Sequence, residues 1–194
     1  MTRRGAAPPF DRSRAARARH CIAVLLAMLV TACTTVPQTR PAAGGETLSG
    51  RLALRVEALG NEPARAFSAA FDLHGDEHAG TLGLATPLGS MLAEARWSAA
   101  EVVLVTPQGT RRFADLDALT REVLGESIPI EAWFDWLRGR PWTGAPSASS
   151  PDVPQGFEQL GWRVDLGRFD EGSVLATRTS PPPTVVARIR LDRS

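Results

Sequence analysis

The sequence predicts a mainly β protein in which two short helices are inserted into an antiparallel sheet. Apolar and polar residues alternate through most of residues 48–191, which is typical of strands with one buried face. Gly, Pro, Ser and Asp separate these runs at short intervals, as expected for hairpin connections. Two segments, 115–125 and 129–139, instead have apolar residues at helical spacing.

The strands that precede the helices are expected to pair as hairpins. The first strand places two leucines and a valine on one face and charged residues on the other. Further strands are expected over 90–97, 101–106 and 111–113, after turns at 75–80 and 98–100. The residues expected to face the interior of these early strands are Leu52, Leu54, Val56, Phe67, Ala69, Phe71, Leu73, Leu82 and Leu84.

The first helix has clear signals at both ends. Asp115 is a favourable N-cap, because its carboxylate can accept hydrogen bonds from the free backbone N–H groups of the first turn. Gly125 is a favourable terminator, because glycine adopts the left-handed conformation that closes many helices. The helix between them places Leu116, Leu119 and Val123 on one face, which we expect to be buried.

The second helix begins with Pro129 in its first turn, where the missing N–H has no cost, and ends at Gly139. Trp136 lies off its apolar stripe and is therefore expected to be partly exposed. Core packing is the favoured interpretation of the stripe, and the lining of a lipid cavity is the alternative. The stripe consists of Ile130, Trp133, Phe134 and Leu137.

The chain after the helices is expected to complete the sheet. Residues 139–155 are rich in Pro, Ser and Gly and predict a surface loop. Strands are then expected over 161–169, 174–177 and 185–191. A curved antiparallel sheet with two helices forms a barrel-like cup, lined by its alternating apolar residues.

The N-terminal residues have the pattern of a processing signal. An arginine-rich segment ends at His20 and is followed by the apolar run 21–30. A membrane-spanning helix needs about 20 apolar residues, so this run is too short to span and has the length of a signal-peptide core.

The run 30–33, Val-Thr-Ala-Cys, resembles a bacterial lipobox. The resemblance implies that residues 1–32 are cleaved off as a signal peptide and that Cys33 is acylated on its sulfur and its new amino group. The alternative is an ordinary signal peptide with a cysteine at this position by chance. Residues 33–47 are then the acylated cysteine and a flexible tether, and residues 48–194 form a single domain.

Charge and composition exclude several classes of function. The chain has 22 basic residues, all arginine, and 21 acidic residues. The leader holds six arginines and one aspartate, so the remainder has 16 basic and 20 acidic residues, a net charge of −4 that disfavours nucleic-acid binding. Without lysine there is no Walker A loop and no Schiff base. Thr34 stands where an aspartate would mark inner-membrane retention, which by resemblance to lipoprotein sorting signals implies the outer membrane.

The sequence contains no recognisable catalytic or metal-binding constellation, so we expect no enzyme, no metal and no cofactor. His74 and His78 flank Asp76 and Glu77 in an expected hairpin turn, which favours a solvated role. After cleavage Cys33 is the only cysteine, too few for a zinc site of the usual kind. A hydrolase that uses two distant carboxylates stays an alternative, because sequence does not give their separation.

A short loop between two apolar strands has an unusual tip. Pro87 and Gly89 favour a tight turn, and the apolar Leu88 lies between them with few neighbours able to bury it. One interpretation is a leucine folded back onto the sheet. The other is an exposed apolar finger that contacts lipid or a partner.

These features together resemble the LolB family of outer-membrane lipoproteins. The resemblance covers most of residues 48–192, and it departs from some relatives in the long arginine-rich leader and the absence of tyrosine. The motifs that carry it are the lipobox, Ser49-Gly50-Arg51, Thr86-Pro87-Leu88-Gly89-Ser90, Leu124-Gly125-Glu126-Ser127-Ile128-Pro129-Ile130, Trp136-Leu137-Arg138-Gly139 and the strand that runs from Pro182-Pro183 to Leu191.

The resemblance implies an incomplete antiparallel β-barrel that encloses an apolar cavity and is covered by short α-helices. It implies a monomeric receptor that accepts triacylated lipoproteins from the periplasmic carrier LolA and delivers them to outer-membrane phospholipid. The family's membrane-delivery leucine maps onto Leu88, flanked by Pro87 and Gly89. The expected acyl-cavity lining is Leu52, Leu54, Val56, Phe67, Phe71, Leu82, Leu84, Trp133, Phe134, Trp136 and Leu137.

Elementary energetics agree with such a role. A triacyl anchor has roughly 40 methylenes, worth on the order of 30 kcal/mol if all of them left water. Passage through water therefore requires an apolar container, and without a nucleotide site the transfer has to run downhill in affinity. A passive structural lipoprotein with a packed sheet is the alternative.

Overall fold

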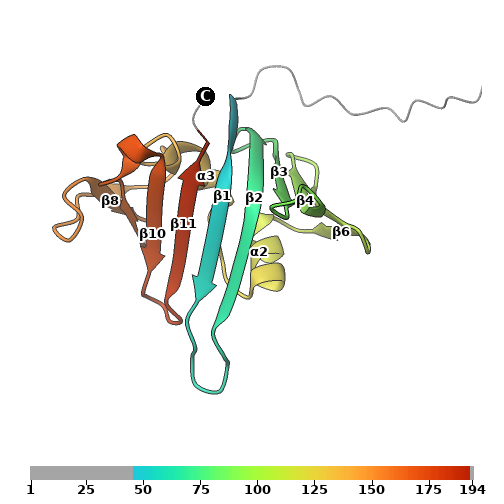
Figure 1. Cartoon of the computed structure of the whole chain (residues 1–194), viewed down its shortest axis with the longest axis horizontal. Helices are drawn as coiled ribbons and strands as arrows, with labels where there is room; N and C mark the ends of the chain where they lie inside the picture. The colour runs from blue at the N-terminus through green and yellow to red at the C-terminus, as the bar shows by residue number, and fades with distance from the viewer. Residues whose placement is uncertain (1–45, 193–194) are drawn as a thin grey trace, which may run out of the picture. The chain divides into compact units, whose positions relative to one another are not determined.

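The structure is a computed structural model and describes residues 46–192. These residues form an 11-stranded antiparallel sheet with two α-helices and one turn of 3-10 helix. The strand order is β6-β5-β4-β3-β2-β1-β11-β10-β9-β8-β7 (Figure 1). The edge strands β6 and β7 do not pair with each other, so the predicted incomplete barrel is confirmed. The strands are β1 (Glu46–Val56), β2 (Arg65–Gly75), β3 (Gly80–Ala85), β4 (Met91–Trp97), β5 (Val102–Thr106), β6 (Gly109–Phe113), β7 (Ser147–Ala148), β8 (Gly156–Gln159), β9 (Trp162–Asp165), β10 (Ser173–Arg178) and β11 (Val185–Leu191).

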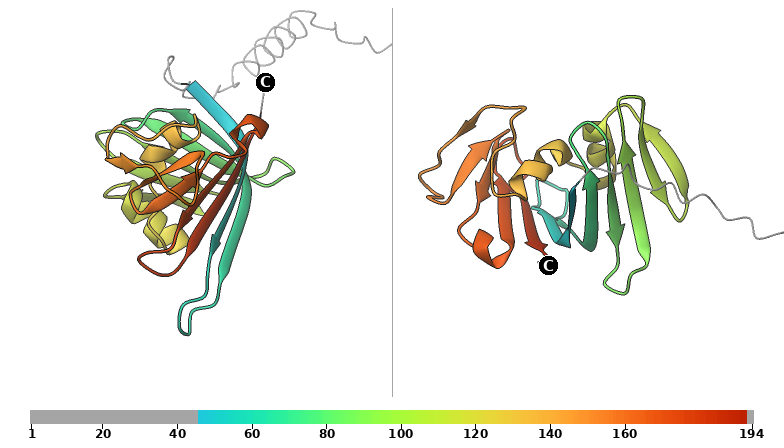
Figure 2. Two further views of the ribbon diagram at one scale, coloured as in Figure 1. Left: turned by 90° about the vertical axis from the view of Figure 1, so that its left-hand side faces the viewer. Right: turned by 90° about the horizontal axis from the view of Figure 1, so that it is seen from above.

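The centre of the sheet joins the beginning of the domain to its end. β1 pairs with β2 along its whole length and with β11, the last strand, on its other edge. At Gly50 the backbones approach so closely that a Cβ would lie 2.1 Å from the carbonyl oxygen of Arg190, which explains the glycine. The sheet bends into a cup, and both helices lie in its hollow (Figure 2).

The helices begin and end as their sequences predict. α2 (Leu116–Leu124) is capped by Asp115, whose carboxylate accepts a hydrogen bond from the backbone N–H of Ala118, and it ends at Gly125 with φ of 77°. α3 (Ile130–Trp136) follows Pro129. None of the helices in residues 46–192 is long and apolar enough to cross a membrane.

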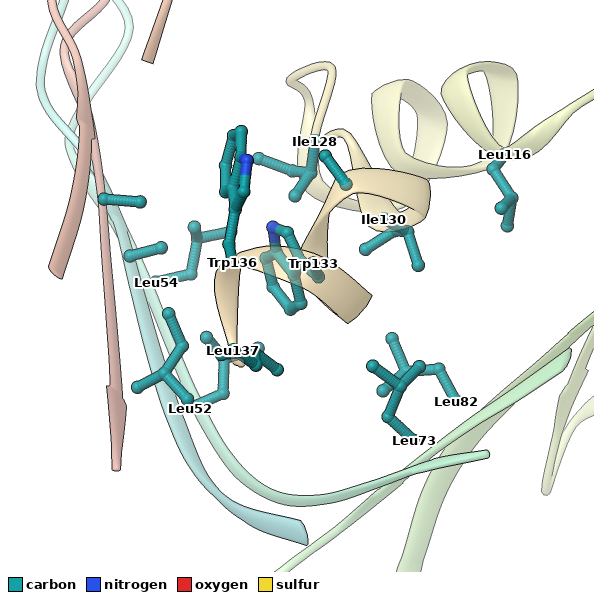
Figure 3. Close-up of a cluster of buried hydrophobic side chains, with 14 of the residues drawn as sticks. Leu52, Leu54, Leu73, Leu82, Leu116, Ile128, Ile130, Trp133, Trp136 and Leu137 are labelled. Atoms are coloured by element: carbon teal, nitrogen blue, oxygen red, sulfur yellow. The ribbon is translucent and has the colours of Figure 1, made fainter. Parts of the chain in front are cut away.

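The core lies between the concave face of the sheet and the helices. Leucines of β1, β2 and β3 surround α3, which contributes Trp133 and Leu137 to the same cluster (Figure 3). The inward positions predicted for β1 are confirmed, since Leu52, Leu54 and Val56 are all buried and the arginines between them are exposed. The alternation therefore fixes which face of the strand meets the core.

Three predictions about the chain's elements were wrong. β1 begins at Glu46, so Glu46 and Thr47 pair with Gly75 and His74 instead of belonging to the tether. The strand expected over 161–169 ends at Asp165 and is followed by η1 (Phe169–Glu171).

The third difference concerns the expected loop over 139–155. It contains the two-residue strand β7, which pairs with β8, a strand that the sequence did not reveal. β8 is only four residues long, too short for its alternation to stand out.

Candidate lipid-binding cavity and exposed loop

An apolar cavity opens between α2 and strands β1 to β5. Its volume is about 370 Å³. Phe67 and Leu84, both half-buried, form part of its wall, and Val56 and Leu54 continue it along β1. The full lining is Leu54, Val56, Arg65, Ala66, Phe67, Leu84, Leu92, Ala93, Leu104, Thr106, Val123 and Leu124.

A smaller inner cavity of about 60 Å³ lies deeper between α2, α3 and the sheet. It shares Leu54, Phe67, Leu84 and several other lining residues with the outer cavity, so the two adjoin. Its wall is almost wholly apolar, and Trp133 of α3 contributes to its inner end. Hydrocarbon is therefore the chemistry that this space suits, since an apolar cavity offers water no hydrogen-bond partners.

Helix α2 forms one side of both cavities. Leu116 and Leu119 are buried as predicted, but Val123 is 47% exposed although it lies on the same helical face. The reason is that Val123 borders the outer cavity, as does Leu124, which also packs against the edge of the core. The C-terminal end of the helix thus lies over unfilled space.

A charged residue, Arg65, is part of the lining of the outer cavity. Arg65 of β2 lies against Gly125, where a Cβ would approach its guanidinium to 2.2 Å, so the glycine leaves room for the arginine beside the helix end. On the neighbouring strand β1, Arg55 lies between the inward Leu54 and Val56 and so faces away from the cavity, where it donates a hydrogen bond of 2.7 Å to Glu57. This hydrogen bond holds the pKa of the Glu57 carboxyl below its usual value.

The other half of the cup is filled. Trp136 stacks at a tilt on Trp162 and edge-on against Phe157, with ring centroids 6.2 and 6.3 Å apart. Its indole N–H donates to Gln159 on β8 at 2.8 Å. Trp136 is only 1% exposed, so the prediction of partial exposure was wrong. The unrecognised strand β8 supplies two of these three partners, Phe157 and Gln159, and β9 supplies Trp162.

The expected lining residues therefore divide into two groups. Those that line one or both cavities are Leu52, Leu54, Val56, Phe67, Leu82, Leu84 and Trp133. Those that pack in the core without lining either of these cavities are Phe71, Phe134, Trp136 and Leu137. Phe134 instead meets Trp97 edge-on, with centroids 6.0 Å apart.

Several lining residues were not anticipated from the sequence. Ala93 and Leu104 come from β4 and β5, whose alternation was recognised but whose inward residues were not connected with a cavity. Leu124 belongs to α2. The sequence does hold one indication of the cavity, which is the small side chain of Ala93. A small residue that faces the hollow of the sheet leaves space there that a larger side chain would fill.

The Thr86–Ser90 connection projects from the sheet on the side away from the helices (Figure 2). Its turn is closed by two backbone hydrogen bonds, from Thr86 N–H to Ser90 O at 2.8 Å and from Gly89 N–H to Thr86 O at 2.9 Å. Gly89 has φ of 85°, a conformation that favours glycine. Leu88 at the tip is 95% exposed, so it is not folded back onto the sheet.

A buried ion pair fastens the α2–α3 connection to the sheet. Arg178 of β10 binds the Glu126 carboxylate and lies 5.7 Å from the ring centre of Trp162. The side chains are 9% and 14% exposed. The Glu126–Pro129 segment that carries α3 is therefore anchored to the half of the cup that is filled.

Two further expectations concern the acylation site and metal binding. Cys33, the expected acylation site, lies outside the described residues. Within residues 46–192, no group of three or more His, Cys, Asp or Glu residues is placed so that it could hold a metal ion.

Comparisons with known proteins identify the family of the chain. A family model described as "Outer membrane lipoprotein LolB" matches residues 47–192. A curated outer-membrane lipoprotein LolB of Bordetella petrii is 32% identical over 91% of this chain and 94% of its own. Those of Bordetella pertussis and Neisseria meningitidis are 35% and 30% identical over 78% and 80% of this chain.

The chain belongs to the LolB family. The resemblance found in its motifs is thereby confirmed, and the protein is an outer-membrane lipoprotein concerned with lipoprotein localisation. LolB is a transport family and not an enzyme family. In this member of the LolB family the cavity lies under α2, and the exposed Leu88 lies on a separate loop of the same sheet.

Proposed function

We propose that the protein is a receptor that accepts lipoproteins from the periplasmic carrier LolA and inserts them into the inner leaflet of the outer membrane without ATP. Cys33 is its acylated anchor, and the domain faces the periplasm as a monomer. Acyl chains of the client occupy the cavity under α2. Leu88, with Pro87 and Gly89 holding its turn, contacts the bilayer when the client leaves.

The observation that carries this proposal is the apolar cavity. A cavity of 150 Å³ takes one benzene molecule, so the outer cavity of about 370 Å³ has room for about 15 carbon atoms. That is about one fatty acyl chain. A triacyl anchor requires more space, and α2 is the element whose displacement would supply it, because Val123 and Leu124 already border empty volume.

Release without fuel requires a graded affinity. Each methylene contributes about 0.8 kcal/mol in an apolar environment, whether that environment is a cavity or a bilayer. A cavity that holds only part of the anchor binds it less tightly than a membrane that buries all of it. Transfer from this cavity to the bilayer is therefore downhill.

A passive structural lipoprotein is the alternative. Such a protein needs a filled core, as the half of the cup around Trp136 has. The half under α2 favours the receptor, because unfilled apolar space costs stability and has no structural purpose.

Two measurements test the proposal. An unacylated soluble form should remove a lipoprotein from LolA in a pull-down, and an apolar fluorescent probe should bind it with saturation and be displaced by the client's acyl chains. Failure of the soluble form to take up client, together with the absence of a saturable site, would favour the structural alternative.

A further inference from the structure

The outer face of the sheet, which points away from the helices, carries an unusual group of arginines. Arg51 of β1 lies directly opposite Arg190 of β11, and Arg188 is the next outward residue of β11. All three are exposed. No hydrogen bond or ion pair joins any of them to another residue within 46–192, although the charge of Arg188 also acts on the nearby Glu57 carboxylate, which itself is bound by Arg55. Like charges directly opposite on paired strands are destabilising unless something neutralises them.

Arg51 and Arg190 share a row of the sheet with the exposed loop, and Arg188 lies in the next outward row, opposite Ala53. The register pairs Arg190 with Arg51, Arg51 with Ala70, and Ala70 with Ala85, after which the Thr86–Ser90 turn begins. Neighbouring strands are about 4.8 Å apart, so Arg51 and Arg190 stand about 10 and 15 Å from the base of the loop.

The surface between the arginines and the loop is smooth. Its outward residues on β1 and β2 are Ala53, Ser68 and Ala70, none of which is large. Small residues here leave no bulky side chain between the arginines and the loop, so both can approach the same membrane surface. The acidic residues Asp72 and Asp192 lie one row further toward the other end of the sheet, on the far side of the arginine row from Arg188.

A polar hollow adjoins the arginines. It has a volume of about 320 Å³ and lies between β9, η1, β10 and β11. Arg188, Arg168 and the hydroxyl-bearing Ser173 line it, and Arg168 is already bound by the Glu171 carboxylate, which leaves Arg188 as the cation without an ion pair in this lining. Its acid, Asp165, already accepts a hydrogen bond from the backbone N–H of Gly167 at 2.8 Å. Such a lining suits a phosphate group, which combines negative charge with several acceptor oxygens.

We propose that this outer face is a docking surface for anionic phospholipid headgroups. Arg51, Arg188 and Arg190, the outer arginines, bind headgroup phosphates while Leu88 enters the bilayer beside them. The outer arginines orient the domain so that the cavity mouth stays free to receive client. This inference rests on the proposed membrane-delivery role of Leu88.

Charge complementarity selects an anionic membrane as the occupant. The mature chain has a net charge of −4, so a general attraction to anionic lipid is not expected. Local arginines close to the surface reverse this, because each basic side chain near an anionic membrane contributes about a five-fold preference. On a neutral bilayer the domain would be held only by the contact of Leu88 with the lipid.

The test uses the acylated full protein reconstituted in vesicles, with single cysteines as reporters. Ala53→Cys places a thiol beside Arg188 on the outer face, and Ala99→Cys places one in the exposed β4–β5 turn. Because Cys33 is acylated, a maleimide modifies only the introduced thiol. We expect labelling at position 53 to be about five-fold slower or more in vesicles with phosphatidylglycerol than in phosphatidylcholine vesicles. Labelling at position 99 should be equal in both.

Charge variants identify the cause. Arg51→Gln/Arg188→Gln/Arg190→Gln should abolish the protection of position 53, and the corresponding triple Lys variant should keep it. A matched control, Arg111→Gln/Arg112→Gln/Arg121→Gln, removes the same charge from β6 and α2 and should also keep it. Equal labelling of position 53 in the two vesicle types, or protection that survives the first triple variant, would overturn the inference.

Lipoprotein transfer from LolA to the same vesicles, measured in parallel, separates this inference from the proposed function. Transfer without protection of position 53 would reject the docking surface and leave the receptor role intact. Protection without transfer would reject the receptor role and leave the docking surface intact. Protection of position 53 together with transfer would support the docking surface and the receptor role.

Discussion

Leu88 contributes little to the fold, and the role proposed for it is contact with the membrane. A leucine side chain that is 95% exposed adds almost nothing to the core, yet it sits on a turn held by backbone hydrogen bonds and a left-handed glycine. The turn therefore holds an apolar group in water, where it gains free energy only by entering another apolar phase. This exposure is the main support for a membrane-contacting role.

Leu88→Glu should leave folding intact and impair delivery. The free energy of unfolding should change by less than about 0.5 kcal/mol, because the side chain contacts no core residue. A leucine side chain that enters the bilayer gains about 2 kcal/mol. The loss of this contact therefore corresponds to about a 30-fold slower release of the client. Single-turnover transfer from receptor to vesicles measures this, with uptake from LolA as the internal control. Normal release by the variant would remove the role assigned to the loop.

The buried guanidinium of Arg178 has one charged partner, the Glu126 carboxylate. It binds Glu126 and covers the face of Trp162, and its Nε atom has no hydrogen-bond partner within the described residues. The loss of either charge would leave the other buried and unpaired. The pair therefore links the α2–α3 connection to β10 in a manner that is sensitive to substitution.

Arg178→Met is expected to destabilise the domain by about 3–5 kcal/mol, since Glu126 then remains as an uncompensated buried charge. The double variant Arg178→Met/Glu126→Leu should recover most of this loss. Urea unfolding measures the free energy of unfolding of each variant, and an unchanged m-value would show that only stability has changed. A loss below about 1 kcal/mol in the single variant would show that Glu126 reaches water when its partner is removed.

At the level of elements, α2 and α3 have different relations to the sheet. α3 is surrounded by core leucines and tryptophans, so its aromatic stripe is largely packing. α2 packs through Leu116 and Leu119 but leaves its C-terminal turn over the cavity. The same amphipathic pattern therefore produces a buried helix in one case and a cavity cover in the other.

Ala93→Phe should fill the cavity from β4. Ala93 lines both the outer and the inner cavity, so a phenyl ring there would occupy space that the client's acyl chains need. Affinity for an apolar fluorescent probe should fall at least about ten-fold, while cavity filling stabilises the domain by about 0.5–2 kcal/mol. Ala53→Phe on the outer face is the matched control and should bind the probe normally. Unchanged probe binding in Ala93→Phe would place the ligand site elsewhere.

The alternation of apolar and polar residues in the strands and the capping residues of the helices made most elements predictable. Strands β1 to β6 and both helices could be predicted, because the period of the hydrophobic residues and the capping residues are local features of the sequence. β8 could not, and neither could the burial of Trp136. Both depend on pairing across the Gly139–Gly156 connection, which no local pattern specifies.

At the scale of the whole molecule, anchor and domain have separate tasks. The folded residues 46–192 bury a hydrophobic core between sheet and helices. The acyl chains of Cys33 would supply membrane residence, and the domain would supply binding and release.

Cys33→Ala should therefore give a folded protein that is not lipid-anchored. Its thermal midpoint should match that of the acylated form in detergent, and it should still accept client from LolA. Circular dichroism and the same pull-down measure these two properties. A variant that unfolds would show that the anchor contributes to the domain's stability.

The sequence by itself determined the class of the fold, the inward face of each main strand, both helix ends and the family. These depend on local periodicity, on turn and cap residues, and on motifs that can be read along the chain. It also identified Leu88 as unusual, because an apolar residue between Pro87 and Gly89 has few neighbours to bury it.

The tertiary structure alone decided which apolar residues enclose space and which fill it. Leu84 and Phe71 both face inward from β-strands, but only Leu84 borders the cavity, while Phe71 is packed in the core. The difference arises from what lies opposite each side chain across the cup. That is set by the curvature of the sheet and the position of α2, and residues distant in the chain determine both.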